Sequence, residues 1–247
     1  MLLGDKMESS GRFLFRWRSY FLLCFAPLII LSLREPEYLE LYLGDTLEDL
    51  FEYFCVAIML AGLALRVFTV AYVPKGTSGR TTKTQIADTL NTTGLYSVVR
   101  NPLYLGNCLI YLGILLFSQK FLITLCICFF LVIYYERIIL AEEAFLTRQF
   151  KDSYLQWAKK TPAFIPNLTL WQPPRLPFSL KSVLRREYTT WLVAFFSLFC
   201  IEVGGDLLAD ANRIDTSWLI ALIIACVLYL VLRQIKKQTN LLDVDGR

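Results

Sequence analysis

Two consecutive acids, Glu142 and Glu143, are the side chains that first suggest chemistry in this sequence. They lie in a stretch of helix-forming residues, and neighbouring residues on a helix point about 100° apart. We therefore expect one carboxylate to face neighbouring helices and the other to face water. Glu136, seven residues before Glu143, lies on the same stripe. Two interpretations stand: a solvated helix face, or a seat for a cationic or hydroxyl-rich ligand.

A second candidate site is the segment GLYSVVRNPLYLG, residues 94–106. Asn101 followed by Pro102 predicts a helix start, with asparagine as the N-cap and proline at the first helical position. The free N–H groups of a helix start, at the positive end of the dipole, favour a carboxylate or a phosphate. Arg100 adds a fixed positive charge beside them. The alternative is that Asn101 only caps the helix and Arg100 extends to lipid headgroups.

The 247 residues contain no histidine. This excludes a Ser-His-Asp triad, a Cys-His pair and the usual histidine-rich zinc sites, so any acid or base is another residue type. The seven cysteines all fall in apolar segments, where free thiols behave as small hydrophobic groups. We expect neither a disulfide framework nor a metal site. A net charge of +4 is too small to suggest nucleic acid as a partner.

The elements that must position these residues are hydrophobic helices. Hydrophobic residues make up 56% of the chain, and they come in blocks that approach or reach the roughly 20 apolar residues of a membrane-spanning helix. We predict an all-α fold, a polytopic membrane bundle of about six transmembrane helices. The predicted spans are residues 19–33, 51–73, 102–117, 120–137, 189–208 and 216–233.

The loops between these spans alternate in charge. Residues 34–50 are acidic, whereas residues 74–101 and 138–188 are rich in Lys and Arg. An excess of Lys and Arg marks the cytoplasmic side of a membrane protein. Both termini and the two longest polar loops are therefore predicted to be cytoplasmic, in a bacterial inner membrane or the endoplasmic reticulum.

The stretch between Lys120 and Pro162 contains no glycine or proline. A single helix of about 40 residues, roughly 60 Å long, fits this stretch. We expect the helix to leave the membrane near Tyr134 and Tyr135, as in an interfacial aromatic belt, and to continue into the cytosol.

The two segments that contain the candidate sites resemble a known family. The segment GLYSVVRNPLYLGN, followed by EEAFLTRQFKDSYLQWAKKTPAFIP, is similar to the isoprenylcysteine carboxyl methyltransferase and phospholipid methyltransferase superfamily of integral membrane enzymes. The resemblance covers about residues 90–166. Together with the predicted spans, it divides the chain into three parts. These are an N-terminal transmembrane helical pair (1–73), a family-like methyltransferase core of loop, helical hairpin and cytosolic helix (74–166), and a linker with a C-terminal transmembrane hairpin (167–247).

The resemblance implies S-adenosylmethionine as the methyl donor. It implies contacts with this cofactor for a set of residues at the two candidate sites: Tyr96, Asn101, Pro102, Leu103, Tyr104, Glu142 and Glu143. It also implies that Arg137 serves the substrate as a catalytic residue. We expect Arg100 to be a catalytic residue as well, because its positive charge favours an acidic substrate group. The family has a histidine where this chain has Asn101; asparagine cannot titrate, but it can still contact the cofactor through its amide or backbone.

The function that we expect is O-methylation of an acidic group, a carboxylate or a phosphate, on a membrane lipid or lipidated substrate at the cytoplasmic face. Such an oxygen is already an anion and needs no general base. One alternative is N-methylation of an amino phospholipid, which needs a proton acceptor from Glu or Tyr. Another is a transporter or scaffold that kept the fold without the activity. Against transport, the predicted spans carry almost no ionisable residue near their centres.

Overall fold

The computed structural model describes residues 3–18, 20–33, 42, 44–74, 76–77, 85–208 and 216–246. Among these residues the elements are helices and no β-strand occurs, which confirms the predicted all-α fold. The elements, in chain order, are α1 (Leu3–Trp17), the 3-10 helix η1 (Phe21–Phe25), α2 (Ala26–Ser32), α4 (Asp45–Ala71), α5 (Leu95–Val98), α6 (Pro102–Phe117), α7 (Phe121–Phe150), α8 (Asp152–Lys160), η2 (Leu168–Leu170), α9 (Leu180–Leu208) and α10 (Thr216–Gln238). Most of the predicted acidic loop, part of the first basic loop and residues 209–215 lie outside this description.

Four of the described helices are long and apolar enough to cross a membrane: α4 from Thr46 onward, α7, α9 and α10. Two shorter apolar helices accompany them, Leu23–Ser32 and α6. Each predicted span therefore coincides with an apolar helix, and the predicted bounds 102–117 are those of α6. The chain is an integral membrane protein with a helical bundle, and the number of six crossings stays a prediction.

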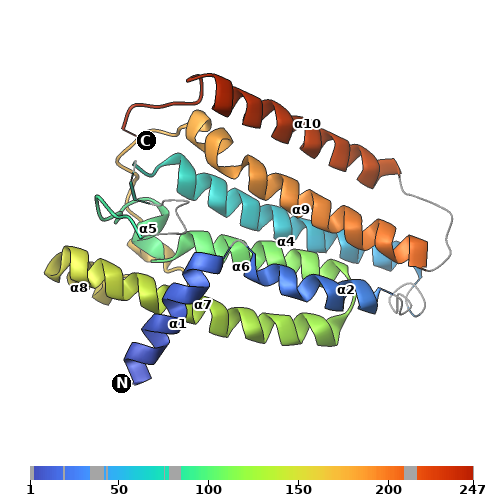
Figure 1. Ribbon diagram of the computed structural model, residues 1–247, viewed down its shortest axis with the longest axis horizontal. Helices are drawn as coiled ribbons and strands as arrows, with labels where there is room; N and C mark the ends of the chain where they lie inside the picture. The colour runs from blue at the N-terminus through green and yellow to red at the C-terminus, as the bar shows by residue number, and fades with distance from the viewer. Residues whose placement is uncertain are drawn as a thin grey trace.

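The long helices run side by side in the order α7, α6, α4, α9 and α10 (Figure 1). Helix α1 crosses α7, while α5, α8 and the segment that follows α8 gather at one end of the bundle. We call this end the α5–α8 end. The two ends of the chain lie toward it as well.

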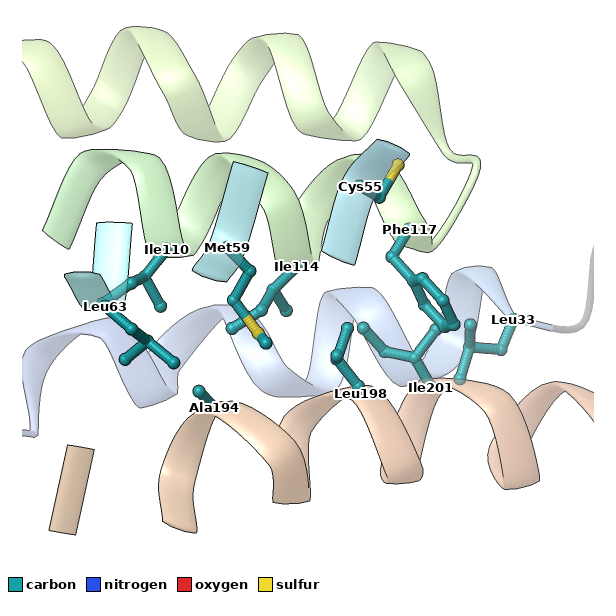
Figure 2. Packing of buried hydrophobic residues seen from close by; sticks show 10 residues of the cluster. All are labelled: Leu33, Cys55, Met59, Leu63, Ile110, Ile114, Phe117, Ala194, Leu198 and Ile201. Carbon is teal, nitrogen blue, oxygen red and sulfur yellow. The ribbon is translucent and has the colours of Figure 1, made fainter. Parts of the chain in front are cut away.

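The first hydrophobic core lies between α4, α6 and α9, with α2 beside it (Figure 2). Its buried members are Leu33, Cys55, Met59, Leu63, Ile110, Ile114, Phe117, Ala194, Leu198 and Ile201. Glycines bring α4 and α6 into backbone contact here: a Cβ on Gly113 would lie 2.6 Å from the Cys55 carbonyl oxygen, and one on Gly62 would lie 2.6 Å from the Gly106 carbonyl oxygen. Small residues at a helix crossing permit this approach, which fixes the position of α6 along α4.

The second core joins α1, α6 and α7, and it corrects one expectation. Tyr134 and Tyr135 are 1% and 4% exposed, packed with Phe15 of α1 and Leu115 of α6. They therefore do not form an interfacial aromatic belt. The reason is that α1 covers this part of α7, with Gly11 so close that a Cβ there would collide with the α7 backbone.

The predicted continuous helix from residue 121 to 160 is wrong at one residue. Lys151, with a φ of 48°, separates α7 from α8. Helix α8 packs against the segment before α6, where the Trp157 indole N–H donates to the Tyr96 carbonyl oxygen at 3.2 Å. Helix propensity is a weak preference that tertiary contacts such as this one override. The helix therefore breaks at Lys151 without a glycine or proline at that position.

Candidate active site

The candidate site begins with the segment that leads into α6, at the α5–α8 end. Gly94, with a φ of 62°, allows the turn into α5. Asn101 and Pro102 then occupy the N-cap and the first position of α6, as predicted. The Asn101 side chain makes no capping hydrogen bond, because its amide donates to the Ala163 carbonyl oxygen at 2.9 Å. The first N–H groups of α6 are therefore left for another acceptor.

Arg100 joins this segment to α7 and α8. Its backbone N–H donates to the Pro162 carbonyl oxygen at 2.9 Å, and its Nη1 donates to the Ala158 carbonyl oxygen at 3.1 Å. Its Nη2 lies 3.0 Å from Glu143 Oε1. Within the described residues its buried Nε has no hydrogen-bond partner. Arg100 thus holds the site together rather than extending to headgroups.

Tyr104 on α6 and Glu142 on α7 lie together in the structure. The Tyr104 hydroxyl donates a hydrogen bond to the Glu142 carboxylate. The Tyr96 hydroxyl lies within electrostatic range of the same carboxylate; burial raises the pKa of Tyr96, and Glu142 raises it further. Tyr96 is therefore a neutral donor at ordinary pH. We call these three residues the Tyr–Glu cluster.

Glu143 points elsewhere, toward Arg100 and Tyr154, whose hydroxyl donates a hydrogen bond to it. The expectation that the two adjacent acids diverge is confirmed. The expectation that one of them faces water is wrong, because the Glu143 side chain is 26% exposed and paired with Arg100. Helix α8, which supplies Tyr154, folds against this side of α7.

The two arginines expected to serve the substrate, Arg100 and Arg137, lie in different surroundings. Arg137 lies where Gly11 of α1 meets the α7 backbone, and its side chain makes no hydrogen bond or ion pair with any described residue of the Tyr–Glu cluster. Arg18, just after α1, instead lies within electrostatic range of both Glu142 and Tyr104. Sequence reasoning missed Arg18 because only the packing of α1 across α7 brings it there.

A buried polar network next to the cluster was also missed. Arg66 of α4 binds Glu187 of α9 through two hydrogen bonds of 2.8 and 2.9 Å, and its Nη1 donates to Asn107 of α6 at 2.5 Å. Asn107 and Tyr111 in turn form side-chain hydrogen bonds with Tyr135 of α7. Arg66 is a charged residue inside a predicted span, and such residues mark functional positions. This charge was the feature of the sequence that could have indicated the network.

The residues present match the chemical groups of S-adenosylmethionine. That molecule carries a carboxylate, an ammonium, ribose hydroxyls and a sulfonium. The uncapped N–H groups at the start of α6 and the unpartnered Nε of Arg100 suit the carboxylate. The Glu142 carboxylate suits the ammonium or the hydroxyls, and tyrosine ring faces attract a sulfonium.

The segment that contains this polar cluster is similar to known proteins. Residues 52–153 match the family model described as phospholipid methyltransferase. This match includes most of α4, all of α6 and α7, and the Tyr–Glu cluster. The predicted resemblance is confirmed: this segment matches the phospholipid methyltransferase family model, which is consistent with the isoprenylcysteine carboxyl methyltransferase and phospholipid methyltransferase superfamily of membrane proteins.

Three curated relatives are similar to parts of the chain. The cobalt-zinc-cadmium resistance protein CzcN of Cupriavidus metallidurans is 34% identical over 51% of this chain and 57% of its own length. The protein-S-isoprenylcysteine O-methyltransferase of Schizosaccharomyces pombe is 39% identical over 31% of this chain and 33% of its own. The nickel-cobalt-cadmium resistance protein NccN of Alcaligenes xylosoxydans xylosoxydans is 31% identical over 34% and 38%. The chain thus spans little more than half of these relatives at most, and no solved structure matches it.

Proposed function

We propose that this protein is an S-adenosylmethionine-dependent methyltransferase that methylates an acidic group, a carboxylate or a phosphate, of a membrane lipid or lipidated substrate at the cytoplasmic face. The observation that carries the proposal is the hydrogen bond between Tyr104 and Glu142, with Tyr96 beside them, inside the family segment. Residues far apart in sequence meet there at one end of the bundle.

Each residue of the site has a proposed task. The start of α6, Asn101 to Tyr104, and Arg100 hold the donor's carboxylate, while Glu142 holds its ammonium or ribose. Glu143 positions Arg100 through their 3.0 Å ion pair. Bound S-adenosylmethionine supplies a methyl group on a sulfonium, and the protein aligns it with the accepting oxygen, which is where orientation contributes most to rate.

The acidic substrate follows from the residue types available. The chain has no histidine, and burial keeps Tyr96 protonated by raising its pKa. A carboxylate or phosphate oxygen attacks without losing a proton, so a site without a general base suits it. Positive charge near the cluster would attract such an anion, and Arg18 is better placed for this than Arg137. The relative from S. pombe is named as an O-methyltransferase of isoprenylcysteine, which agrees with a lipidated carboxylate.

The second candidate is N-methylation of an amino phospholipid, since the matching family model is described as phospholipid methyltransferase. In that case Glu142, released from Tyr104, would have to accept the amine proton. The two candidates predict products of different stability.

The test is a methylation assay of the purified protein with radiolabelled S-adenosylmethionine and total membrane lipid. For a carboxylate substrate we expect label that mild base releases as methanol, because carboxylic methyl esters are base-labile. For a phosphate substrate the label survives mild base, and mass spectrometry of the product should place the added methyl group on the phosphate. Label that resists base and stays on the headgroup amine would support the N-methylation candidate instead. No labelled lipid with the intact protein, under conditions where a Glu142→Ala variant gives the same background, would contradict the enzyme function.

A further inference from the structure

We propose that Glu187 and Arg66 are positioning residues of the site. The C-terminal helical pair α9–α10, which lies outside the family segment, then contributes to donor binding. The proposal rests on the proposed function, because it names residues that support the same donor site. Glu187 lies beyond residue 153, where the family match ends.

The ion pair between them is buried and geometrically complete. Glu187 is 1% exposed, and the Arg66 side chain is 14% exposed. Both oxygens of the Glu187 carboxylate accept a hydrogen bond, one from Nε and one from Nη2 of Arg66. The remaining Nη1 donates to Asn107. A guanidinium held at three points in this way has one orientation, which lysine could not reproduce.

Two contacts connect the Arg66 guanidinium to the Tyr–Glu cluster: one between Asn107 and Tyr135, and one between Tyr135 and Tyr104. Asn107 lies three residues after Tyr104, so both point to one side of α6. Asn107 also bonds to Tyr135, whose ring centre lies 5.1 Å from that of Tyr104. Tyr104 therefore packs, besides its bond to Glu142, against a ring whose side chain is hydrogen-bonded to the network.

A second connection runs through Tyr96. Its hydroxyl lies within electrostatic range of Arg66 and of Arg186, the residue before Glu187. Helices α4 and α9 thus present positive charge to one member of the cluster, while α7 presents the Glu142 carboxylate. A shift of α9 would change the balance at Tyr96.

Packing alone does not explain the pair. Helix α9 already contributes Ala194, Leu198 and Ile201 to the first hydrophobic core. Buried ion pairs seldom add net stability relative to apolar side chains, since desolvation opposes the attraction. The pair lies toward the α5–α8 end, and Arg66 is within electrostatic range of Tyr96 of the cluster. Its fixed geometry can therefore orient the side chains of the cluster.

The experiment measures donor affinity and thermal stability on the full-length protein in lipid nanodiscs. Two variants change the pair: Glu187→Gln removes its charge, and Arg66→Lys keeps the charge but loses the three-point geometry. The control is Asp243→Asn, because Asp243 forms an exposed ion pair of 2.6 Å with Arg185 on the same helix and does not contact the network. Affinity is expressed per folded molecule, so that simple destabilisation does not alter it.

We expect each pair variant to weaken S-adenosylmethionine binding about tenfold, a usual size for coupling between neighbouring sites, and the control to change it less than twofold. Unchanged affinity in a folded Glu187→Gln or Arg66→Lys protein overturns the proposal while the proposed function stands. If Glu187→Gln does not fold, the affinity of the Arg66→Lys variant for S-adenosylmethionine tests the proposal by itself. An unmodified protein that binds no donor overturns both, which distinguishes the two failures.

Discussion

Glu142 and Tyr104 are predictable at the residue scale, whereas the charges around them are not. The Glu-Glu pair and the Asn-Pro helix start are local signals, and both led to residues that lie together in the structure. Arg18 and Glu187 reach the same region from outside the family segment. No spacing along the chain connects them to it, because their position depends on how α1 and α9 pack.

The choice between Arg18 and Arg137 gives the first prediction. Arg18→Gln should raise the KM for an acidic lipid substrate about tenfold or more, since a hydrogen bond or ion contact to a charged group contributes about 1.5–3 kcal/mol. Arg137→Gln should change it less than about threefold by the same reasoning, because Arg137 has no bond to the cluster. Steady-state kinetics at fixed donor concentration compare the two. A larger effect at Arg137 would return that residue to the substrate role.

At the element scale, helices were easier to predict than their interruptions. The bounds of α6 follow from Pro102 and the apolar run behind it. The break at Lys151 does not, because a lysine with positive φ carries no local signal and α8 is held by contacts with Tyr96 and Glu143. The burial of Tyr134 and Tyr135 likewise depends on α1, an amphipathic helix that hydropathy alone does not place.

The crossing of α4 and α6 gives the second prediction. Gly113→Ala should destabilise the protein by about 1–3 kcal/mol, as overpacking usually does, since the added Cβ would meet the Cys55 carbonyl oxygen at 2.6 Å. Gly4→Ala is the control, because nothing lies within 4 Å of a Cβ there. Thermal unfolding in detergent measures both. Equal midpoints would mean that the two backbones are not in contact.

The attachment of α1 gives the third prediction, a dependence on pH. Arg148 lies 3.0 Å from Glu8 and lowers the pKa of that carboxyl, with Arg12 of the same helix adding to the effect. A lowered folded-state pKa stabilises the docked helix above the ordinary glutamate pKa, and the stabilisation is lost as the pH falls below that ordinary value and through the lowered pKa of Glu8.

Hydrogen exchange of α1 at pH 7 and at acidic pH checks this expectation. The unmodified protein should exchange faster in α1 at low pH, after correction for the intrinsic pH dependence of exchange. A Glu8→Gln variant should show faster exchange at both values and little further change. The same acid response in the variant would assign the effect to another group.

At the scale of the whole molecule, apolar blocks predicted the bundle, and the family segment contains the candidate site. The neighbour order α7, α6, α4, α9, α10 could not be predicted, because it depends on glycine contacts and on the ion pair between Arg66 and Glu187. The description of the spans overlooked Arg66, a charge inside a predicted span that is paired with Glu187, 121 residues later in the chain.

Orientation gives the fourth prediction. Both chain ends lie toward the α5–α8 end, and the basic loops predict that this end is cytoplasmic. A green fluorescent protein fused after residue 247 should fluoresce in bacterial cells, whereas alkaline phosphatase at the same point should be inactive. The reverse pattern would put the candidate site on the opposite face, away from a cytoplasmic donor.

Donor binding to the purified full-length protein is the most direct test of the central claim, that the start of α6 and Glu142 together hold S-adenosylmethionine. Isothermal titration in nanodiscs should give saturable binding of one donor per chain, weakened about tenfold or more by Glu142→Gln, the loss expected for one charge-assisted hydrogen bond. Glu136→Gln, at an exposed position of the same helix, should leave it unchanged. Absence of binding, or equal binding by the Glu142 variant, would contradict the account.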